Sequence, residues 1–286
     1  MRPAIVTDSN SQLPSTLQHR YGIRVVPIPV TVDGTSYLEG VDLDADGFYA
    51  LFGDTTPEVT TSQPSPGAFV ETYQACAAAG HDQVISIHVG SALSGTLNSA
   101  RIAAGMVDID VRLVDSQTLS FGVSCCAWQA AQVLDEGGSI DQAIAAAEGL
   151  AEQLFSVTAL GAAELLHASG RVVFDTSATG VDVFRSGPGG SFESVGVGHD
   201  VTQITDLLAA TMHLDGAPIR VALGIADASA LPYYDGLESR LALRDDVTEI
   251  VRYRIGPSVG AFTGLGTAGG FWYPSSPDSL RSSCLS

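Results

Sequence analysis

Short apolar runs alternate with longer segments of helical periodicity along the first half of the chain. The apolar runs predict strands, and those at 83–89 and 110–116 are continuous enough to indicate buried ones. The segment 65–80 predicts a helix, with Pro66 at its start and Gly80 at its end. Strands that alternate with helices are typical of a parallel sheet, which we expect through about residue 150.

Five further elements complete this pattern. Strands are predicted at 3–9 and 23–34, and the prolines within the second indicate an edge. The remaining helices are predicted at 44–52, 121–138 and 139–154, the last capped by Ser139.

The second half of the chain has a different pattern. Short apolar runs flank the turn sequence SGPGG, at 186–190, and predict a β-hairpin. Helices at 200–213 and 228–242 and strands at 218–226 and 246–255 follow.

We therefore predict an α/β protein of two domains, at 1–155 and 156–274. The first would contain a mainly parallel sheet and the second a mixed or antiparallel one, and we expect a disordered tail at 275–286.

Composition excludes several function classes. The net charge is −19, with 13 basic and 32 acidic residues, which argues against nucleic-acid binding. Every basic residue is arginine, so a Walker lysine and a lysine Schiff base are excluded. The four cysteines lack metal-ligand spacing. Cys125 and Cys126 are expected to be buried thiols, and we predict no cofactor and no metal.

No apolar run reaches about 18 residues and the N-terminus is polar by Thr7, so we expect no membrane insertion and a cytoplasmic location.

Hydroxyl side chains concentrate in loops that each precede a predicted helix. These loops are Thr7–Pro14, Thr60–Phe69, Gly90–Thr96 and Val114–Gly122. Loops after parallel strands share one edge of a sheet, and helix N-termini at that edge favour an anion. Ser94 could donate a hydrogen bond to such an anion, and Gly95 would let it approach the backbone. Asp8 and Asp115 are interpreted as capping or turn residues.

Other chemistry is less well supported. Ser94 could be the nucleophile of a serine hydrolase acting on acyl esters, but the G-x-S-x-G spacing is absent around it. The nearest histidine, His88, lies within a predicted strand, where a hydrogen-bonded core histidine is expected. The glycines of Gly264–Gly269 fit G-x-G-x-x-G, but no helix follows them, which argues against a dinucleotide site.

The four loops together, in this order, resemble the DegV family of bacterial fatty-acid-binding proteins. The matching segments are VTDSNSQLP, TSQPSPGAF, SIHVGSALSGTLNSA, VDSQTLSFG, GRV and IGPSVGAFTG. The resemblance implies two α/β domains with an acyl chain in an apolar tunnel between them. It assigns the head group of a long-chain fatty acid to Thr61 and Ser94, beside Ser62 and Gly95. It further implies a carrier without catalysis of its own, which in some members presents the acid to a fatty acid kinase.

The sequence departs from the family in two places. Phe262 stands where family members carry a histidine that binds the carboxylate, so we expect an apolar wall there. The segment after GRV is shortened and lacks a lysine, in a region linked to docking on the kinase, which weakens the case for that partner. A degenerate member with an altered ligand, or with a protein-interaction role, is therefore a further alternative.

Overall fold

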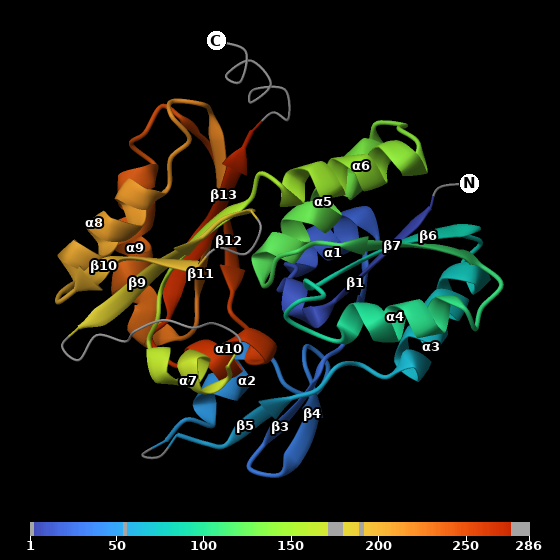
Figure 1. Ribbon diagram of the computed structural model, residues 1–286, viewed down its shortest axis with the longest axis horizontal. Coiled ribbons are helices and arrows are strands. Elements are labelled where there is room, and N and C mark those ends of the chain that lie inside the picture. The colour runs from blue at the N-terminus through green and yellow to red at the C-terminus, as the bar shows by residue number, and fades with distance from the viewer. Residues whose placement is uncertain (1–2, 54–55, 171–179, 189–191, 276–286) are drawn as a thin grey trace. The chain divides into compact units, whose positions relative to one another are not determined.

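The computed structural model describes residues 3–53, 56–170, 180–188 and 192–275 (Figure 1). The chain forms two compact units: residues 1–44 with 52–151, and residues 45–51 with 152–286. Residues 45–51 lie within the first predicted domain in the sequence and belong to the second unit in the structure. From residue 276 on, the predicted disordered tail lies outside the described residues.

A four-stranded parallel sheet forms the centre of the first unit, in the order β2-β1-β6-β7. Its strands are β1 (Ala4–Asp8), β2 (Arg24–Val26), β6 (Gln83–His88) and β7 (Asp110–Asp115). The predicted parallel sheet is confirmed. The expectation that β7 is fully buried is wrong: it is an edge strand, and exposed and half-buried residues alternate along most of it.

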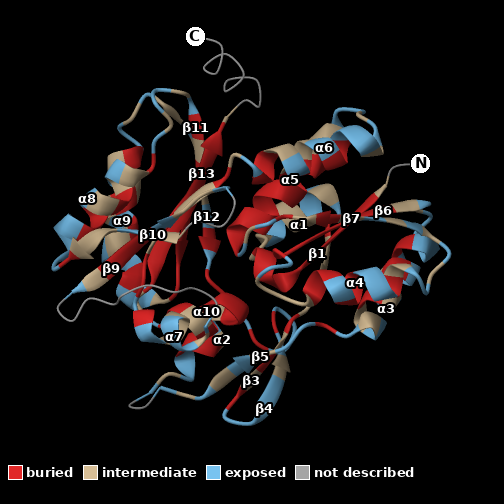
Figure 2. Ribbon diagram, viewed as in Figure 1, coloured by how far each residue is buried: buried red, intermediate tan, exposed pale blue. Residues whose placement is uncertain are grey.

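Helices cover both faces of this sheet (Figure 1). They are α1 (Ser15–Tyr21), α3 (Pro66–Ala78), α4 (Thr96–Ala104), α5 (Phe121–Asp135) and α6 (Ile140–Ala151). Alternate residues of β6 face opposite sides: Ile85 and Ile87 pack with α5, and Val84 packs with Phe69 and Tyr73 of α3. The sheet is buried between these two apolar clusters (Figure 2). Cys125 and Cys126 are buried in α5, as predicted.

A second, three-stranded sheet belongs to the first unit, in the order β4-β3-β5. Its strands are β3 (Pro29–Val32), β4 (Thr35–Leu38) and β5 (Val59–Thr61), all antiparallel. The single proline-interrupted strand predicted at 23–34 is therefore wrong, because its residues form β2 and β3 in two different sheets. The helix predicted at 44–52 forms α2 (Ala45–Ala50).

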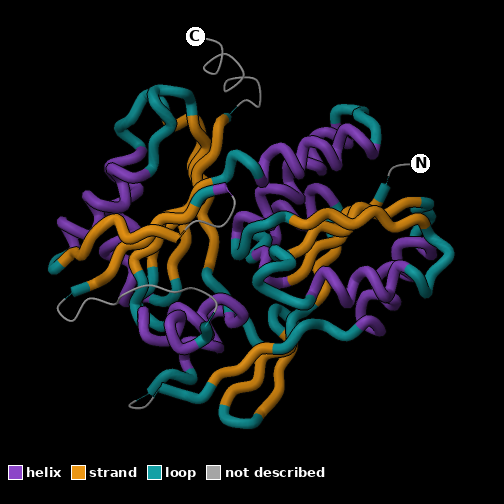
Figure 3. The backbone as a smooth tube through the Cα atoms, viewed as in Figure 1, coloured by secondary structure: helices purple, strands orange, loops and turns teal. Residues whose placement is uncertain are grey.

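The second unit is built on a six-stranded mixed sheet, in the order β10-β9-β8-β13-β11-β12. Figure 3 shows its strands in orange and the helices beside them in purple. Its strands are β8 (Phe155–Ala159), β9 (Val181–Ser186), β10 (Phe192–Gly198), β11 (Ile219–Ile225), β12 (Val247–Arg254) and β13 (Ala268–Pro274). Only β11 and β12 pair in parallel among these, so the predicted mixed sheet is confirmed for the described residues. Gly264–Gly269 leads into β13, as expected, and not into a helix.

The helices of the second unit are short apart from two. These two, α8 (Val201–Thr211) and α9 (Leu231–Leu241), pack on each other and on the sheet. The other described α-helices of this unit are α2, α7 (Ala163–Ala168) and α10 (Pro257–Thr263). The predicted hairpin is present as the antiparallel pair β9 and β10, although residues 189–191 of its turn lie outside the described residues. Most of the GRV segment, from residue 171 to residue 179, also lies outside them.

Candidate functional site

Three of the hydroxyl-rich loops follow the carboxyl ends of β1, β6 and β7, which are neighbours in the parallel sheet. These loops contact one another directly. The Gly90 N–H donates to the Thr118 carbonyl at 2.8 Å, and the Ser120 N–H donates to Asn10 Oδ1 at 2.8 Å. The predicted convergence of these loops on one edge is therefore observed within the first unit.

A buried hydrogen-bonded chain lies beneath these loops. His88 Nδ1 is 2.9 Å from Asp8 Oδ2, and His88 Nε2 is 2.6 Å from Ser86 Oγ. Ser86 Oγ is in turn 2.8 Å from Tyr73 Oη, and burial raises the pKa of Tyr73 to about 12. Asp8, Ser86 and His88 are each 0% exposed. His88 is thus the hydrogen-bonded core histidine that its position in the strand predicted.

Asp8 has further partners that extend this chain into the loops. It accepts the Asn10 N–H on Oδ1 at 3.0 Å and the Val89 N–H on Oδ2 at 3.1 Å. The carbonyl of His88 accepts the Ser116 hydroxyl at 2.6 Å. Asp8 therefore caps the turn after β1, as predicted, and also fixes the start of the loop after β6.

The loop after β1 is also tied to the three-stranded sheet. Ser9 Oγ donates to the buried carboxylate of Glu39 at 2.5 Å and accepts the Ile28 N–H at 2.9 Å. In these loops, Gln12, Gln117 and Ser120 each have a φ of 53°, which is unfavourable for residues other than glycine. Strained backbone that surrounding structure holds in place is typical of ligand-binding loops.

Ser94 lies just before the N-terminus of α4 and is half-buried. Its Oγ is 2.9 Å from Thr96 Oγ1 and accepts the Thr96 N–H at 3.3 Å. When the Thr96 hydroxyl also donates to Ser94, both lone pairs of Ser94 are occupied and its own proton is left for another acceptor. The Ser94 hydroxyl is hydrogen-bonded to Thr96 and not to His88. This geometry does not suit a serine nucleophile, which is activated by an adjacent base.

Thr61 and Ser62 lie at the end of β5, in the second hydroxyl-rich loop. Thr61 is half-buried opposite Val30, and the exposed Ser62 donates its N–H to the Pro29 carbonyl at 3.1 Å. The next residue, Gln63, reaches the third loop. A Cβ placed on Gly95 would lie 1.7 Å from Gln63 Oε1, so the Gln63 amide lies directly against Gly95. This contact was not anticipated, since glutamine in a loop carries no pattern that indicates a partner.

Comparison with known proteins identifies the family. The model of the family described as "Uncharacterised protein, DegV family" matches residues 2–178, which is more than half of the chain. The chain belongs to the DegV family. A DegV domain-containing protein of Streptomyces coelicolor is 31% identical over 276 residues, which span 93% of this chain and 96% of the relative.

Solved structures of DegV proteins share the fold. A DegV family protein from Thermus thermophilus, described as binding fatty acid, is 29% identical with a TM-score of 0.83, over 96% of this chain and 100% of its own. DegV of Bacillus subtilis, described as a fatty acid binding protein, is 24% identical with a TM-score of 0.79, over 96% of this chain and 100% of its own. The resemblance and the α/β fold predicted from the sequence are therefore confirmed.

The predicted DegV site residues divide between the two units. Thr61, Ser62, Ser94 and Gly95 belong to the first unit, where the contact between Gln63 and Gly95 joins their two loops. Phe262 belongs to the second unit, near the end of α10, and is half-buried. The role of Phe262 as an apolar wall stays a prediction.

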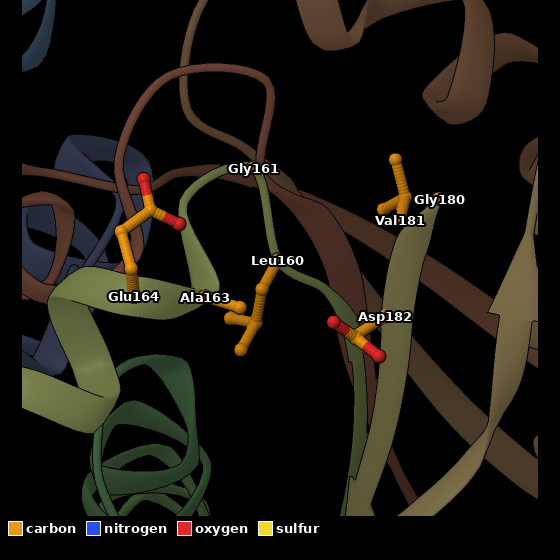
Figure 4. Close-up of a pocket in the computed structure, with 7 residues that line it drawn as sticks. All are labelled: Leu160, Gly161, Ala163, Glu164, Gly180, Val181 and Asp182. Carbon is orange, nitrogen blue, oxygen red and sulfur yellow. The ribbon is translucent and has the colours of Figure 1, made fainter. Parts of the chain in front are cut away.

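A separate, partly open pocket of about 170 Å³ lies within the second unit of this DegV chain. Figure 4 shows its lining residues, Leu160, Gly161, Ala163, Glu164, Gly180, Val181 and Asp182. None of the predicted site residues lines it. Within the described ranges no group of three or more His, Cys, Asp or Glu could hold a metal ion, and no helix is long and apolar enough to cross a membrane.

Proposed function

We propose that this DegV chain binds a long-chain fatty acid, with the carboxylate held by Thr61 and Ser94 and by backbone amides at the start of α4. The loops that carry these hydroxyls adjoin through Gln63 and Gly95. The 29% identical Thermus thermophilus relative, described as binding fatty acid, supports the same ligand class here.

The hydrogen bonds of the Ser94 hydroxyl with Thr96 are the main support for the proposal. Thr96 can supply both of the hydrogen bonds that Ser94 accepts, and when it does so the Ser94 proton is left for a ligand acceptor. A carboxylate offers acceptors only, and it is favoured at a helix N-terminus. Gly95, the N-cap of α4, has no side chain, and the Gln63 amide lies against it.

The two parts of a fatty acid would make different contributions. Each methylene group removed from water contributes about 0.8 kcal/mol, so the acyl chain supplies most of the affinity. Hydroxyls and amides satisfy the carboxylate without a salt bridge, which keeps the acid releasable. The head-group residues therefore set the orientation and the preference for an acid more than the total affinity.

Paired substitutions test these assignments in a direct titration with hexadecanoate. Ser94→Ala removes the proposed donor, and we expect it to weaken binding by about 1–2 kcal/mol, the scale of one hydrogen bond to a charged group. Ser91→Ala is its control, because Ser91 lies in the same loop but donates to Asp115 at 2.5 Å. Thr61→Val has its control in Thr60→Val, since Thr60 is the exposed neighbour on the other face of β5. Equal affinities for Ser94→Ala and Ser91→Ala would refute the role of Ser94.

The proposal covers carriage of the acid and no catalysis. The departures from the family pattern after Gly170 leave a fatty acid kinase partner without support in this sequence. A hydrolase is less well supported, because Ser94 pairs with a threonine and His88 already pairs with Asp8 and Ser86. An active serine would label with a fluorophosphonate probe, and we expect no labelling.

A further inference from the structure

The space around residue 95, and not its backbone conformation, explains why it is a glycine. Its φ of −75° and ψ of 0° are open to residues with a side chain, so its conformation does not require glycine. The space where a Cβ would stand is filled instead. Oε1, Cδ and Nε2 of Gln63 lie 1.7, 2.7 and 3.3 Å from that position. The absence of a Cβ at Gly95 therefore leaves room for the Gln63 amide at the N-terminus of α4.

Gln63 is an exposed residue, and the next residue along the chain, Pro64, is buried. Gln63 follows Thr61 by two positions in the sequence and lies against Gly95, the neighbour of Ser94. Its amide carries two N–H donors and one acceptor oxygen.

We propose that Gln63 is a third head-group residue, whose side-chain N–H donates to the carboxylate of the bound acid. This inference rests on the proposed function and deepens it. A neutral amide adds a donor without adding a charge, so it favours an acid over the corresponding alcohol. A glutamate of nearly the same shape at this position would repel the same ligand.

Affinities for two ligands of equal chain length test the role of Gln63. Hexadecanoate and 1-hexadecanol are titrated into the wild type, Gln63→Ala and Gln63→Glu. Loss of one hydrogen bond to a charged group corresponds to about a tenfold loss of affinity for hexadecanoate. We expect this loss for Gln63→Ala, a larger loss for Gln63→Glu, and a change of less than about twofold for 1-hexadecanol with either variant.

Gln74→Glu is the matched control for added charge. Gln74 is an exposed glutamine on α3 of the same unit, so its replacement changes the net charge equally. We expect Gln74→Glu to bind hexadecanoate as the wild type does. A loss of affinity in Gln74→Glu equal to that in Gln63→Glu would overturn the inference, because the effect would then be one of net charge.

A double-mutant cycle tests the route through Gly95. Gly95→Ala places a methyl group where the Gln63 amide lies, and a flexible exposed side chain can move away, so we expect little change in unfolding temperature. Affinity for hexadecanoate should fall about as far as in Gln63→Ala, and the double variant should fall no further. Additive losses would overturn the inference, since the two residues would then act separately.

The failure of this inference is distinguishable from that of the proposed function. If the wild type does not bind hexadecanoate or carry any fatty acid, the proposed function fails and the role of Gln63 fails with it. If the wild type binds and Gln63→Ala binds equally well, only the role of Gln63 is refuted.

Discussion

Replacement of Asp8 by asparagine is a sharp test of the buried chain beneath the loops, because it keeps the shape of the side chain and removes its charge. The carboxylate accepts the Asn10 N–H on one oxygen, and His88 Nδ1 and the Val89 N–H on the other. An asparagine has only one acceptor oxygen. In its better orientation, the amide NH₂ faces the Asn10 N–H and the oxygen keeps the other two partners.

The expected magnitude follows from these three bonds. One buried donor left without an acceptor costs about 1–3 kcal/mol, and each retained bond weakens by about 1 kcal/mol when its acceptor becomes neutral. We therefore expect Asp8→Asn to lower the free energy of unfolding by about 3–5 kcal/mol. Water cannot replace the lost partner, because Asp8 and His88 are both 0% exposed.

Asp115→Asn is the matched control. Asp115 ends β7 as Asp8 ends β1, and it also accepts three hydrogen bonds, from the Ser91 N–H, the Ser91 hydroxyl and the Gln117 N–H. These bonds are exposed, so water can replace them, and we expect a loss below about 1 kcal/mol. Urea unfolding followed by tryptophan fluorescence measures both variants, and hydrogen exchange over residues 4–8 and 83–88 localises the change. Equal losses in the two variants would refute the reasoning from burial.

Two further predictions concern the head-group site and the second unit. Thr96→Val removes the hydroxyl that orients Ser94 at 2.9 Å, and we expect affinity for hexadecanoate to fall by about threefold and to be restored in Thr96→Ser. A rise in affinity would mean that Ser94 donates to Thr96 and not to the ligand. In the second unit, hydrogen bonding from Arg244 lowers the pKa of the Asp246 carboxyl, so the pair stabilises the fold above the ordinary carboxyl pKa of about 3.9 and this contribution is lost as the pH falls through the lowered pKa. Urea unfolding of the wild type and Asp246→Asn at pH 7 and pH 3 should show a smaller difference at pH 3, and a constant difference would contradict the assignment.

The elements that periodicity marks strongly were predictable from the sequence. Ser139 illustrates this at the level of one residue, because the predicted N-cap accepts the Gln142 N–H at 3.2 Å. The division of residues 23–34 between two sheets was missed, since the pattern shows apolar positions and not the partner of each strand. The exposure of β7 was missed for a related reason: a strand's place at the edge of a sheet depends on tertiary structure.

The candidate site was predictable in its composition and not in its contacts. The hydroxyl-rich loops were expected at one edge, and Asp8 was expected to cap a turn. Its bond to His88 joins residues that are far apart in the sequence, and no local pattern indicates it. The same holds for Gln63 and Gly95, where the sequence offers only a glycine whose purpose depends on a distant side chain.

Carriage of a fatty acid by this DegV chain can be tested on the purified protein itself. Native mass spectrometry of the purified protein, followed by organic extraction of any bound molecule, tests it most directly. We predict a stoichiometric adduct with the mass of a long-chain fatty acid, which is recovered as the free acid on extraction. A protein that is isolated empty and remains empty after incubation with hexadecanoate would contradict the account, as would a bound lipid without a free carboxylate.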